Sequence, residues 1–75
     1  MNRQRVASKM IKSWAFDPER ALLEVEFQNG RVYQYADVPE FLVKGFELAE
    51  SKGHFFLTRI DNRFKTEEVK REMLT

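Results

Sequence analysis

The stretch that decides the predicted fold is Gly30-Arg31-Val32-Tyr33-Gln34-Tyr35-Ala36-Asp37-Val38-Pro39. It opens with a turn glycine, and its two tyrosines then alternate at the two-residue period of a β-strand. A proline preceded by an acidic residue follows at once, which indicates the start of a helix. Asp37 and Glu40 also have the spacing of a capping box. A strand that passes directly into a helix is thus the centre of the predicted architecture.

The segment before this stretch, residues 21–27, is the clearest predicted strand. Its core, Leu23-Glu24-Val25-Glu26-Phe27, alternates apolar and acidic residues. This alternation is typical of a strand with one buried and one solvated face. Gln28-Asn29-Gly30 then closes a hairpin onto the tyrosine strand.

Two registers of this hairpin are open, and they place the tyrosines on opposite faces. A two-residue Asn-Gly turn sets Tyr33 and Tyr35 beside the glutamates on the solvated face. A three-residue loop, with Gly30 in the left-handed conformation, sets Val25 opposite Tyr33 and Leu23 opposite Tyr35. We favour the second register, because it gathers the apolar side chains on one face.

The flanking segments predict a further strand and a long helix. Residues 9–16 predict a first strand whose imperfect alternation indicates a bulge or two buried faces. Residues 17–20 predict a turn around Pro18. Residues 38–50 predict a helix, within which Gly45 is expected to admit a close aromatic or backbone approach. Its apolar stripe leaves out Val43 and comprises Val38, Phe41, Leu42, Gly45, Phe46, Leu48 and Ala49.

The C-terminal third predicts one more short helix. Ser51 can cap its N-terminus, and Phe56, Ile60 and Phe64 recur every four residues as its apolar stripe. The predicted fold class is therefore α+β: a three-stranded antiparallel β-meander packed by one long and one short helix, with an optional short C-terminal helix. We expect residues 1–8 to be a flexible basic arm, residues 9–64 a single domain and residues 65–75 a C-terminal extension.

Composition limits the classes of protein that this chain can represent. Seventy-five residues allow one domain, whose core is small for its surface. The chain has no cysteine and one histidine, so we expect neither a disulfide framework nor a metal or other cofactor. The polar, basic N-terminus is unlike a signal peptide, and no apolar run approaches membrane-spanning length. We therefore predict a soluble cytoplasmic protein without membrane partners.

The ordered pattern of residues resembles the KTSC domain, a small family named for the C-terminus of some lysyl-tRNA synthetases and also found as free-standing bacterial proteins. The resemblance runs from about residue 8 to residue 64. The positions that carry it are Ser8, Ile11, Phe16-Asp17, Leu23-x-Val25-x-Phe27, Gly30, Tyr33-x-Tyr35, Val38-Pro39, Gly45, Ser51-Lys52-Gly53, Phe55-Phe56, Ile60 and Phe64.

The chain departs from the family pattern at three places, each time towards lower polarity. Ala15-Phe16-Asp17 stands where the family usually has Gly-Tyr-Asp, Phe55-Phe56-Leu57 where it has Tyr-Phe-Asn, and Phe64 where it has a tyrosine. The family has no established function. RNA binding has been inferred for the family because the domain occurs together with a tRNA-charging enzyme. The resemblance therefore implies RNA, of the tRNA class, as a partner.

No arrangement of residues predicts catalysis or a small-molecule substrate. His54 has no second histidine or cysteine with which to form a metal site. Ser8, Ser13 and Ser51 lack the context of an activated nucleophile. Glu24-x-Glu26 is also the ordinary pattern of a solvated strand face. We therefore predict a small non-catalytic accessory binding module rather than an enzyme.

Two basic groups and the two tyrosines are the candidate nucleic-acid-binding residues. Cations can meet phosphates if the fold brings the groups together, and aromatic rings can stack bases if their face is open. The candidates are Arg3, Arg5, Lys9, Lys12, Tyr33, Tyr35, Arg59, Arg63 and Lys65. The alternative is a protein-interaction or homodimerisation module, favoured by the small core and by an uncovered sheet face with Val32 and Trp14.

Overall fold

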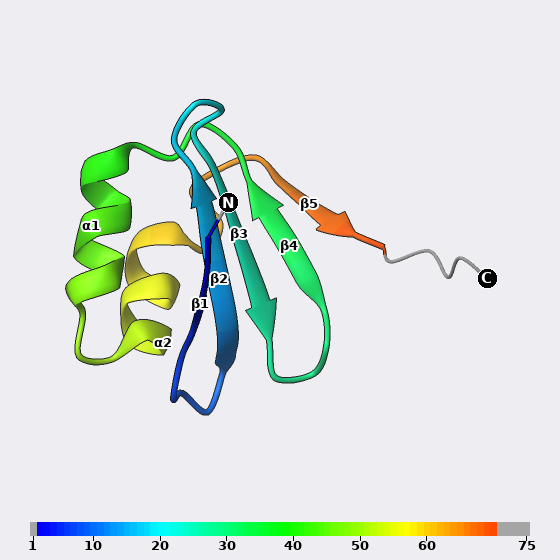
Figure 1. Ribbon diagram of the computed structural model, residues 1–75, viewed down its shortest axis with the longest axis vertical. Coiled ribbons are helices and arrows are strands. Elements are labelled where there is room, and N and C mark those ends of the chain that lie inside the picture. Colours follow the sequence, from blue (N-terminus) through cyan, green and yellow to red (C-terminus); the bar gives the residue numbers. More distant parts are fainter. Residues whose placement is uncertain (1, 71–75) are drawn as a thin grey trace.

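The computed structural model describes residues 2–70 and consists of one antiparallel sheet with a helical layer on one side (Figure 1). The sheet has five strands in the order β1-β2-β3-β4-β5, so each strand pairs with its neighbour in sequence. The strands are β1 (Arg3–Arg5), β2 (Ile11–Asp17), β3 (Leu22–Phe27), β4 (Val32–Tyr35) and β5 (Thr66–Val69). The first three connections between strands are short, whereas the connection from β4 to β5 contains the helical segments.

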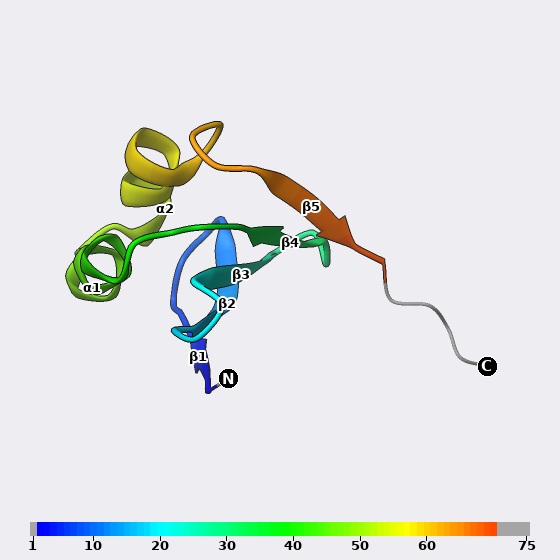
Figure 2. The same cartoon turned by 90° about the horizontal axis from the view of Figure 1, so that it is seen from above.

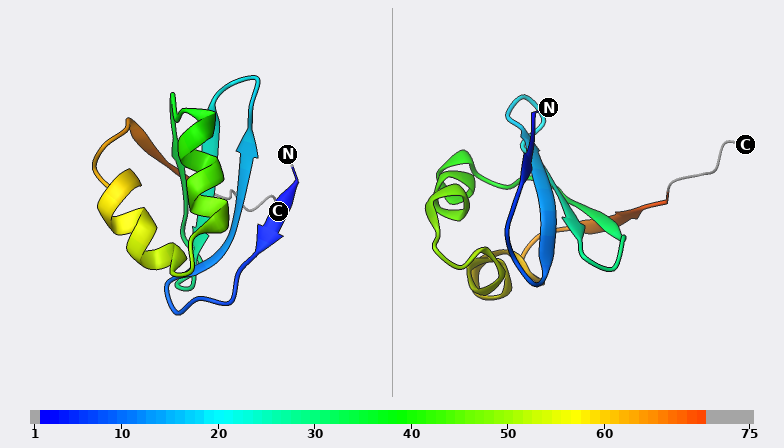
Figure 3. Two further views of the ribbon diagram at one scale, coloured as in Figure 1. Left: turned by 90° about the vertical axis from the view of Figure 1, so that its left-hand side faces the viewer. Right: turned by 60° about the horizontal axis from the view of Figure 1, so that its bottom comes forward.

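Three helical segments lie between β4 and β5 and cover the same face of the sheet (Figures 2 and 3). They are α1 (Glu40–Leu48), α2 (Lys52–Phe55) and the π-helical turn η1 (Phe56–Ile60), which continues α2. Within residues 2–70, no helix is both long enough and apolar enough to cross a membrane. The core lies between this layer and the sheet, and its fully buried members include Ile11, Leu23, Val25, Phe46 and Ile60.

The hairpin of β3 and β4 has the register that the sequence favoured. Val25 lies opposite Tyr33 and Leu23 opposite Tyr35, so both tyrosines share the helix-covered face with the apolar residues of β3. Gly30 has φ +89° and donates its N–H to the carbonyl of Phe27 at 2.9 Å. Only a residue without Cβ adopts this conformation at no steric cost, which explains the glycine at this position.

Strand β2 contains the irregularity that its sequence indicated. Its register against β3 shifts between Ile11 and Ser13, so that Lys12 is the extra residue of a β-bulge. Ile11 pairs with Phe27 and Trp14 with Val25. The bulge therefore places Ile11 and Trp14, three residues apart, on the same buried face. Trp14 lies in the core, and the prediction that it lines an uncovered sheet face is wrong.

The sheet has five strands rather than the predicted three. Arg3–Arg5, inside the expected basic arm, form β1 on the outer edge of β2. Thr66–Val69, where a final short helix was an option, form β5 on the outer edge of β4. Both added strands consist largely of polar residues, so neither has the apolar alternation by which strands are recognised. The rest of that optional helix, residues 71–75, lies outside the described residues.

Helix α1 is shorter than predicted and is rotated relative to the predicted stripe. It buries Val43 and Phe46, whereas Phe41 and Leu48 are 77% and 82% exposed. The predicted stripe assumed one continuous helix over residues 38–50, but Pro39 and Ala49 at its two ends have extended backbone. The expected capping box is also absent, since no side chain caps the helix and Asp37 has φ +58°.

Gly45 fulfils the role that the sequence indicated. A Cβ atom at this position would lie 3.0 Å from Cζ of Phe55, which is closer than carbon atoms normally approach. The glycine therefore lets the ring of Phe55 pack directly against the backbone of α1. This contact sets how closely α1 and α2 approach each other.

Candidate nucleic-acid interface

Arg3 and Arg5 lie on the open face of the sheet, opposite the helical layer. Their partners in β2 are Ala15 and Ser13, on the face that the bulged strand turns away from the core. The guanidinium of Arg3 donates to the hydroxyl of Ser13 at 2.7 Å and forms an ion pair with Glu24. Arg3 is thus engaged within the protein, and its charge is largely balanced.

The contacts of Arg3 belong to a polar network across four strands. The Ser13 hydroxyl, in a residue only 3% exposed, donates to a carboxylate oxygen of Glu26 at 2.8 Å. The amide of Gln34 donates to the second oxygen of Glu24 at 2.9 Å. This network was not predicted from the sequence. The sequence feature that could have indicated the network is the two-residue period shared by Arg3-x-Arg5 and Glu24-x-Glu26. This period predicts that opposite charges face each other in one sheet.

Arg5 and Lys12 are exposed beside this network. Together with Arg3, Ser13 and Glu26 they line a small cavity of about 220 Å³ on the open face. The ion pairs found within residues 2–70 are Arg3–Glu24 and Arg20–Asp17, and they involve neither Arg5 nor Lys12. Both cations are therefore available to an external anion.

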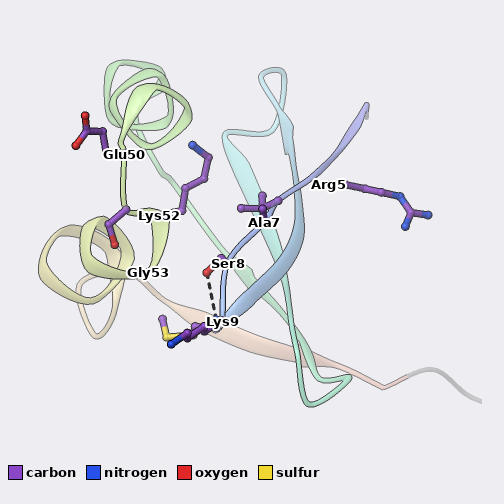
Figure 4. A pocket seen from close by; sticks show the side chains of 10 residues that line it. Arg5, Ala7, Ser8, Lys9, Glu50, Lys52 and Gly53 are labelled. Carbon is purple, nitrogen blue, oxygen red and sulfur yellow. Dashed lines mark hydrogen bonds between the residues drawn. The ribbon is translucent and has the colours of Figure 1, made fainter.

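Lys9 lies at the rim of a larger groove, of about 570 Å³, between the β1–β2 connection and the start of α2 (Figure 4). Figure 4 shows the side chain of Arg5 pointing away from this groove. Lys52 also lines it, but its ammonium donates to the carbonyls of Glu47 and Ala49, at 2.9 and 3.0 Å, at the end of α1. Cations near helix C-termini stabilise the exposed carbonyls. The ammonium of Lys52 therefore stabilises the end of α1.

The serines of the groove have local structural partners. The hydroxyl of Ser8 accepts the backbone N–H groups of Met10 and Ile11, at 3.1 and 3.2 Å. The hydroxyl of Ser51 accepts the N–H of His54 at 3.2 Å, which confirms Ser51 as the cap of α2. Within the described part of the chain, no group of three or more histidine, cysteine, aspartate or glutamate side chains is placed to hold a metal ion.

The second basic group lies at a different part of the fold. The guanidinium of Arg59, on η1, stacks over the ring of Phe55 at 5.7 Å from its centroid. Arg63 is in the turn after η1, and Lys65 directly precedes β5, with its carbonyl accepting the N–H of Ala36. Because β1 and β5 are opposite edges of the sheet, the fold does not join this group to Arg3 and Arg5 (Figure 1).

The tyrosines are packed between the sheet and the helical layer. Tyr35 is 3% exposed and meets Phe56 edge-on, with ring centroids 5.5 Å apart. Tyr33 is half-buried and meets Phe27 in the same manner at 5.8 Å. Burial raises the pKa of Tyr35 well above that of a free tyrosine, and the negative charge of Asp61 adds to this effect. The ring of Tyr35 therefore has no open face on which a base could stack.

Comparisons with known proteins agree with the sequence pattern. A family model for the KTSC domain matches residues 7–64. The crystal structure of a KTSC domain protein from Yersinia pestis superimposes with a TM-score of 0.87 at 38% identity, covering 92% of this chain and 97% of that chain. An uncharacterized protein of Stutzerimonas stutzeri is 39% identical over 56 residues, which cover 75% of this chain and 79% of that protein.

A lysine–tRNA ligase of Nostoc sp. contains a similar stretch. It is 34% identical to this chain over 59 residues. The match covers 79% of this chain but only 10% of the ligase. The similarity therefore concerns one small part of that enzyme.

Proposed function

Because the chain belongs to the KTSC domain family, we propose that it is a non-catalytic accessory module that binds RNA through Arg5, Lys9 and Lys12. The observation that carries the proposal is the position of these cations. All three are exposed, they flank or lie in the β1–β2 connection, and the ion pairs found within residues 2–70 leave them free. The similar stretch in a lysine–tRNA ligase supports RNA as the partner class.

Phosphate contacts are the chemistry that this arrangement favours. Arginine and lysine neutralise backbone phosphates and release counterions, which makes binding strongly dependent on salt. Base stacking contributes little here, because Tyr35 is buried and Tyr33 is packed against Phe27. We therefore expect modest affinity, weak sequence preference and a contact surface at the β1–β2 end of the sheet.

A titration with a transfer RNA and an unrelated single-stranded RNA tests this proposal. Amide shifts in NMR spectra are followed at low salt and at about 0.15 M salt, where the screening length is about 8 Å. We expect shifts for Arg5, Lys9 and Lys12 that weaken as salt rises. If neither RNA shifts these amides at low salt, the proposal is wrong.

Two triple variants locate the contact. The variant Arg5→Ala, Lys9→Ala, Lys12→Ala is expected to lower affinity and to reduce the slope of log K against log salt by about 2–3. The variant Arg59→Ala, Arg63→Ala, Lys65→Ala removes the same charge from the other part of the fold and is the matched control. Equal losses in both variants would mean that binding follows net charge, and the proposed surface would be excluded.

A protein-interaction module is the second candidate function. The observation that favours it is the exposure of three large apolar side chains in the helical layer, Phe41, Leu48 and Leu57. Such residues contribute to protein interfaces when they lie together on one surface.

A further inference from the structure

The open face of the sheet carries two rows of side chains across β1, β2 and β3, each with an arginine on β1 and a glutamate on β3. In the first row Arg3 reaches across to Glu24 and closes the row with an ion pair. In the second row Arg5 is the register partner of Ser13, and Ser13 is the partner of Glu26. The ion pairs found within residues 2–70 do not include one between Arg5 and Glu26. The second row therefore stays open, with a cation at one end and a carboxylate at the other.

The open row lines the small cavity of about 220 Å³, together with Arg3 and the bulge residue Lys12. Every side chain that lines this cavity is polar or charged. The Ser13 hydroxyl donates to one carboxylate oxygen of Glu26 at 2.8 Å, which orients the carboxylate. Among the hydrogen bonds and ion pairs found within residues 2–70, none engages the second oxygen of this carboxylate. The cavity thus combines two cations without ion-pair partners, Arg5 and Lys12, with a carboxylate that can accept a further hydrogen bond.

This combination suits a ligand that has a phosphate and a hydroxyl side by side. A phosphate alone would gain from the two cations but would also meet the negative charge of the carboxylate. A neighbouring hydroxyl makes that carboxylate a favourable partner, because an ionised carboxylate accepts hydrogen bonds and a hydroxyl donates one. In RNA the ribose 2′-hydroxyl is on the carbon next to the one that carries the 3′ phosphate. DNA has the phosphate but lacks this hydroxyl.

We propose that the cavity holds one sugar–phosphate unit of RNA, with Arg5 and Lys12 at the phosphate and Glu26 accepting from the ribose 2′-hydroxyl, an assignment that rests on the RNA binding proposed above. Pockets that enclose whole drug-sized ligands have volumes of about 300–1,000 Å³. A cavity of about 220 Å³ is smaller, so the base stays outside it. Glu26 is thus a specificity-determining residue, which favours RNA over DNA without reading the base sequence.

Three single-stranded probes of about ten uridine nucleotides isolate the contribution of the 2′-hydroxyl. The first is RNA, the second is its 2′-deoxy form, and the third has fluorine in place of each 2′-hydroxyl. Fluorine preserves the RNA-like sugar conformation but cannot donate a hydrogen bond. Fluorescence anisotropy at low salt measures the dissociation constant for each probe. We expect RNA to bind about tenfold more tightly than the other two, as the loss of one hydrogen bond to a charged group predicts.

Glu26→Gln tests the role of the carboxylate. Glutamine keeps the shape of the side chain, but it carries no charge and is a weaker acceptor. We expect the deoxy probe to bind more tightly to this variant than to the wild type, and the preference for RNA to fall to about threefold or less. Glu67→Gln is the matched control, because Glu67 is exposed on β5, outside the cavity, and its replacement raises the net charge by the same amount. It should strengthen the binding of all three probes alike and leave the preference for RNA unchanged.

The binding of the three probes to the wild type distinguishes a failure of this site from a failure of the proposed function. If all three bind equally, or if the fluorinated probe binds as tightly as RNA, the assignment of Glu26 is wrong, while RNA binding through phosphate contacts stands. A preference for RNA that survives Glu26→Gln, or that falls equally in Glu67→Gln, overturns the assignment as well. If no probe binds, the proposed function and this site are both wrong. The comparison of probes on the wild type does not depend on the folding of any variant.

Discussion

Trp14 on β2 meets Phe46 on α1 edge-on, with ring centroids 5.3 Å apart and ring planes inclined by 72°. The contact depends on the bulge at Lys12, which turns Trp14 towards the helical layer. Both rings are buried, Phe46 completely. This aromatic pair joins α1 to the sheet, as the edge-on contacts of Phe56 with Phe27 and Tyr35 join η1 to it.

Phe46→Ala is therefore expected to destabilise the domain by about 3–5 kcal/mol, from lost burial and an unfilled cavity. A domain of this size has little stability in reserve, so the variant should be largely unfolded at 37 °C. Urea denaturation followed by circular dichroism measures the change. Phe41→Ala, on the same helix but exposed, should stay within about 0.5 kcal/mol of the wild type. Similar losses in both variants would contradict the orientation of α1.

The contrast between Phe41 and Phe46 shows where sequence reasoning succeeds and where it fails. The register of the β3–β4 hairpin was predictable, because only one register gathers Leu23, Val25 and both tyrosines on one face. The side of α1 that is buried was not predictable. A nine-residue helix with apolar residues on several sides has no single apolar stripe that identifies its buried face. Contacts with Trp14, distant in sequence, and with Phe55 on the following helix select the buried side.

The edge strands were missed for a different reason. β1 is held by ladder hydrogen bonds and by the contacts of Arg3 with Ser13 and Glu24, and polar contacts of this kind leave no apolar pattern. The sequence identified the two groups of cations but not their separation in the fold. That separation follows from β1 and β5 forming opposite edges, which became apparent only once both were known to be strands.

Ser13→Ala tests the polar network on the open face. The substitution removes a hydroxyl that accepts from Arg3 and donates to Glu26, in a nearly inaccessible position. We expect a loss of about 1–3 kcal/mol and faster hydrogen exchange of the β1 amides. In an Arg3→Ala background the same substitution should cost at least about 0.5 kcal/mol less, since the two residues act together. Strictly additive losses would show that the Arg3–Ser13 bond contributes nothing.

Gly45→Ala tests the close approach of Phe55 to α1. Alanine in place of glycine favours a helix by about 1 kcal/mol, but its Cβ would meet the Phe55 ring at 3.0 Å. We expect these effects to offset each other, so that the stability of Gly45→Ala stays within about 0.5 kcal/mol of the wild type. In a Phe55→Leu background, where the ring is absent, the same substitution should stabilise by about 1 kcal/mol. An equal effect in both backgrounds would contradict the contact.

The burial of Tyr35 predicts a loss of stability in alkali. Burial, aided by Asp61, raises the pKa of Tyr35 above the ordinary value of 10.0, so the unfolded chain loses this proton at lower pH than the folded domain does. Stability is therefore unaffected below pH 10 and falls above it, by up to about 1.4 kcal/mol per pH unit. Tyr35→Phe keeps the ring but has no proton to lose, so the difference between the two proteins in urea denaturation isolates this effect from other titrating groups. A difference that stays constant from pH 8 to pH 11 would mean that the hydroxyl ionises as readily in the folded domain as in the unfolded chain.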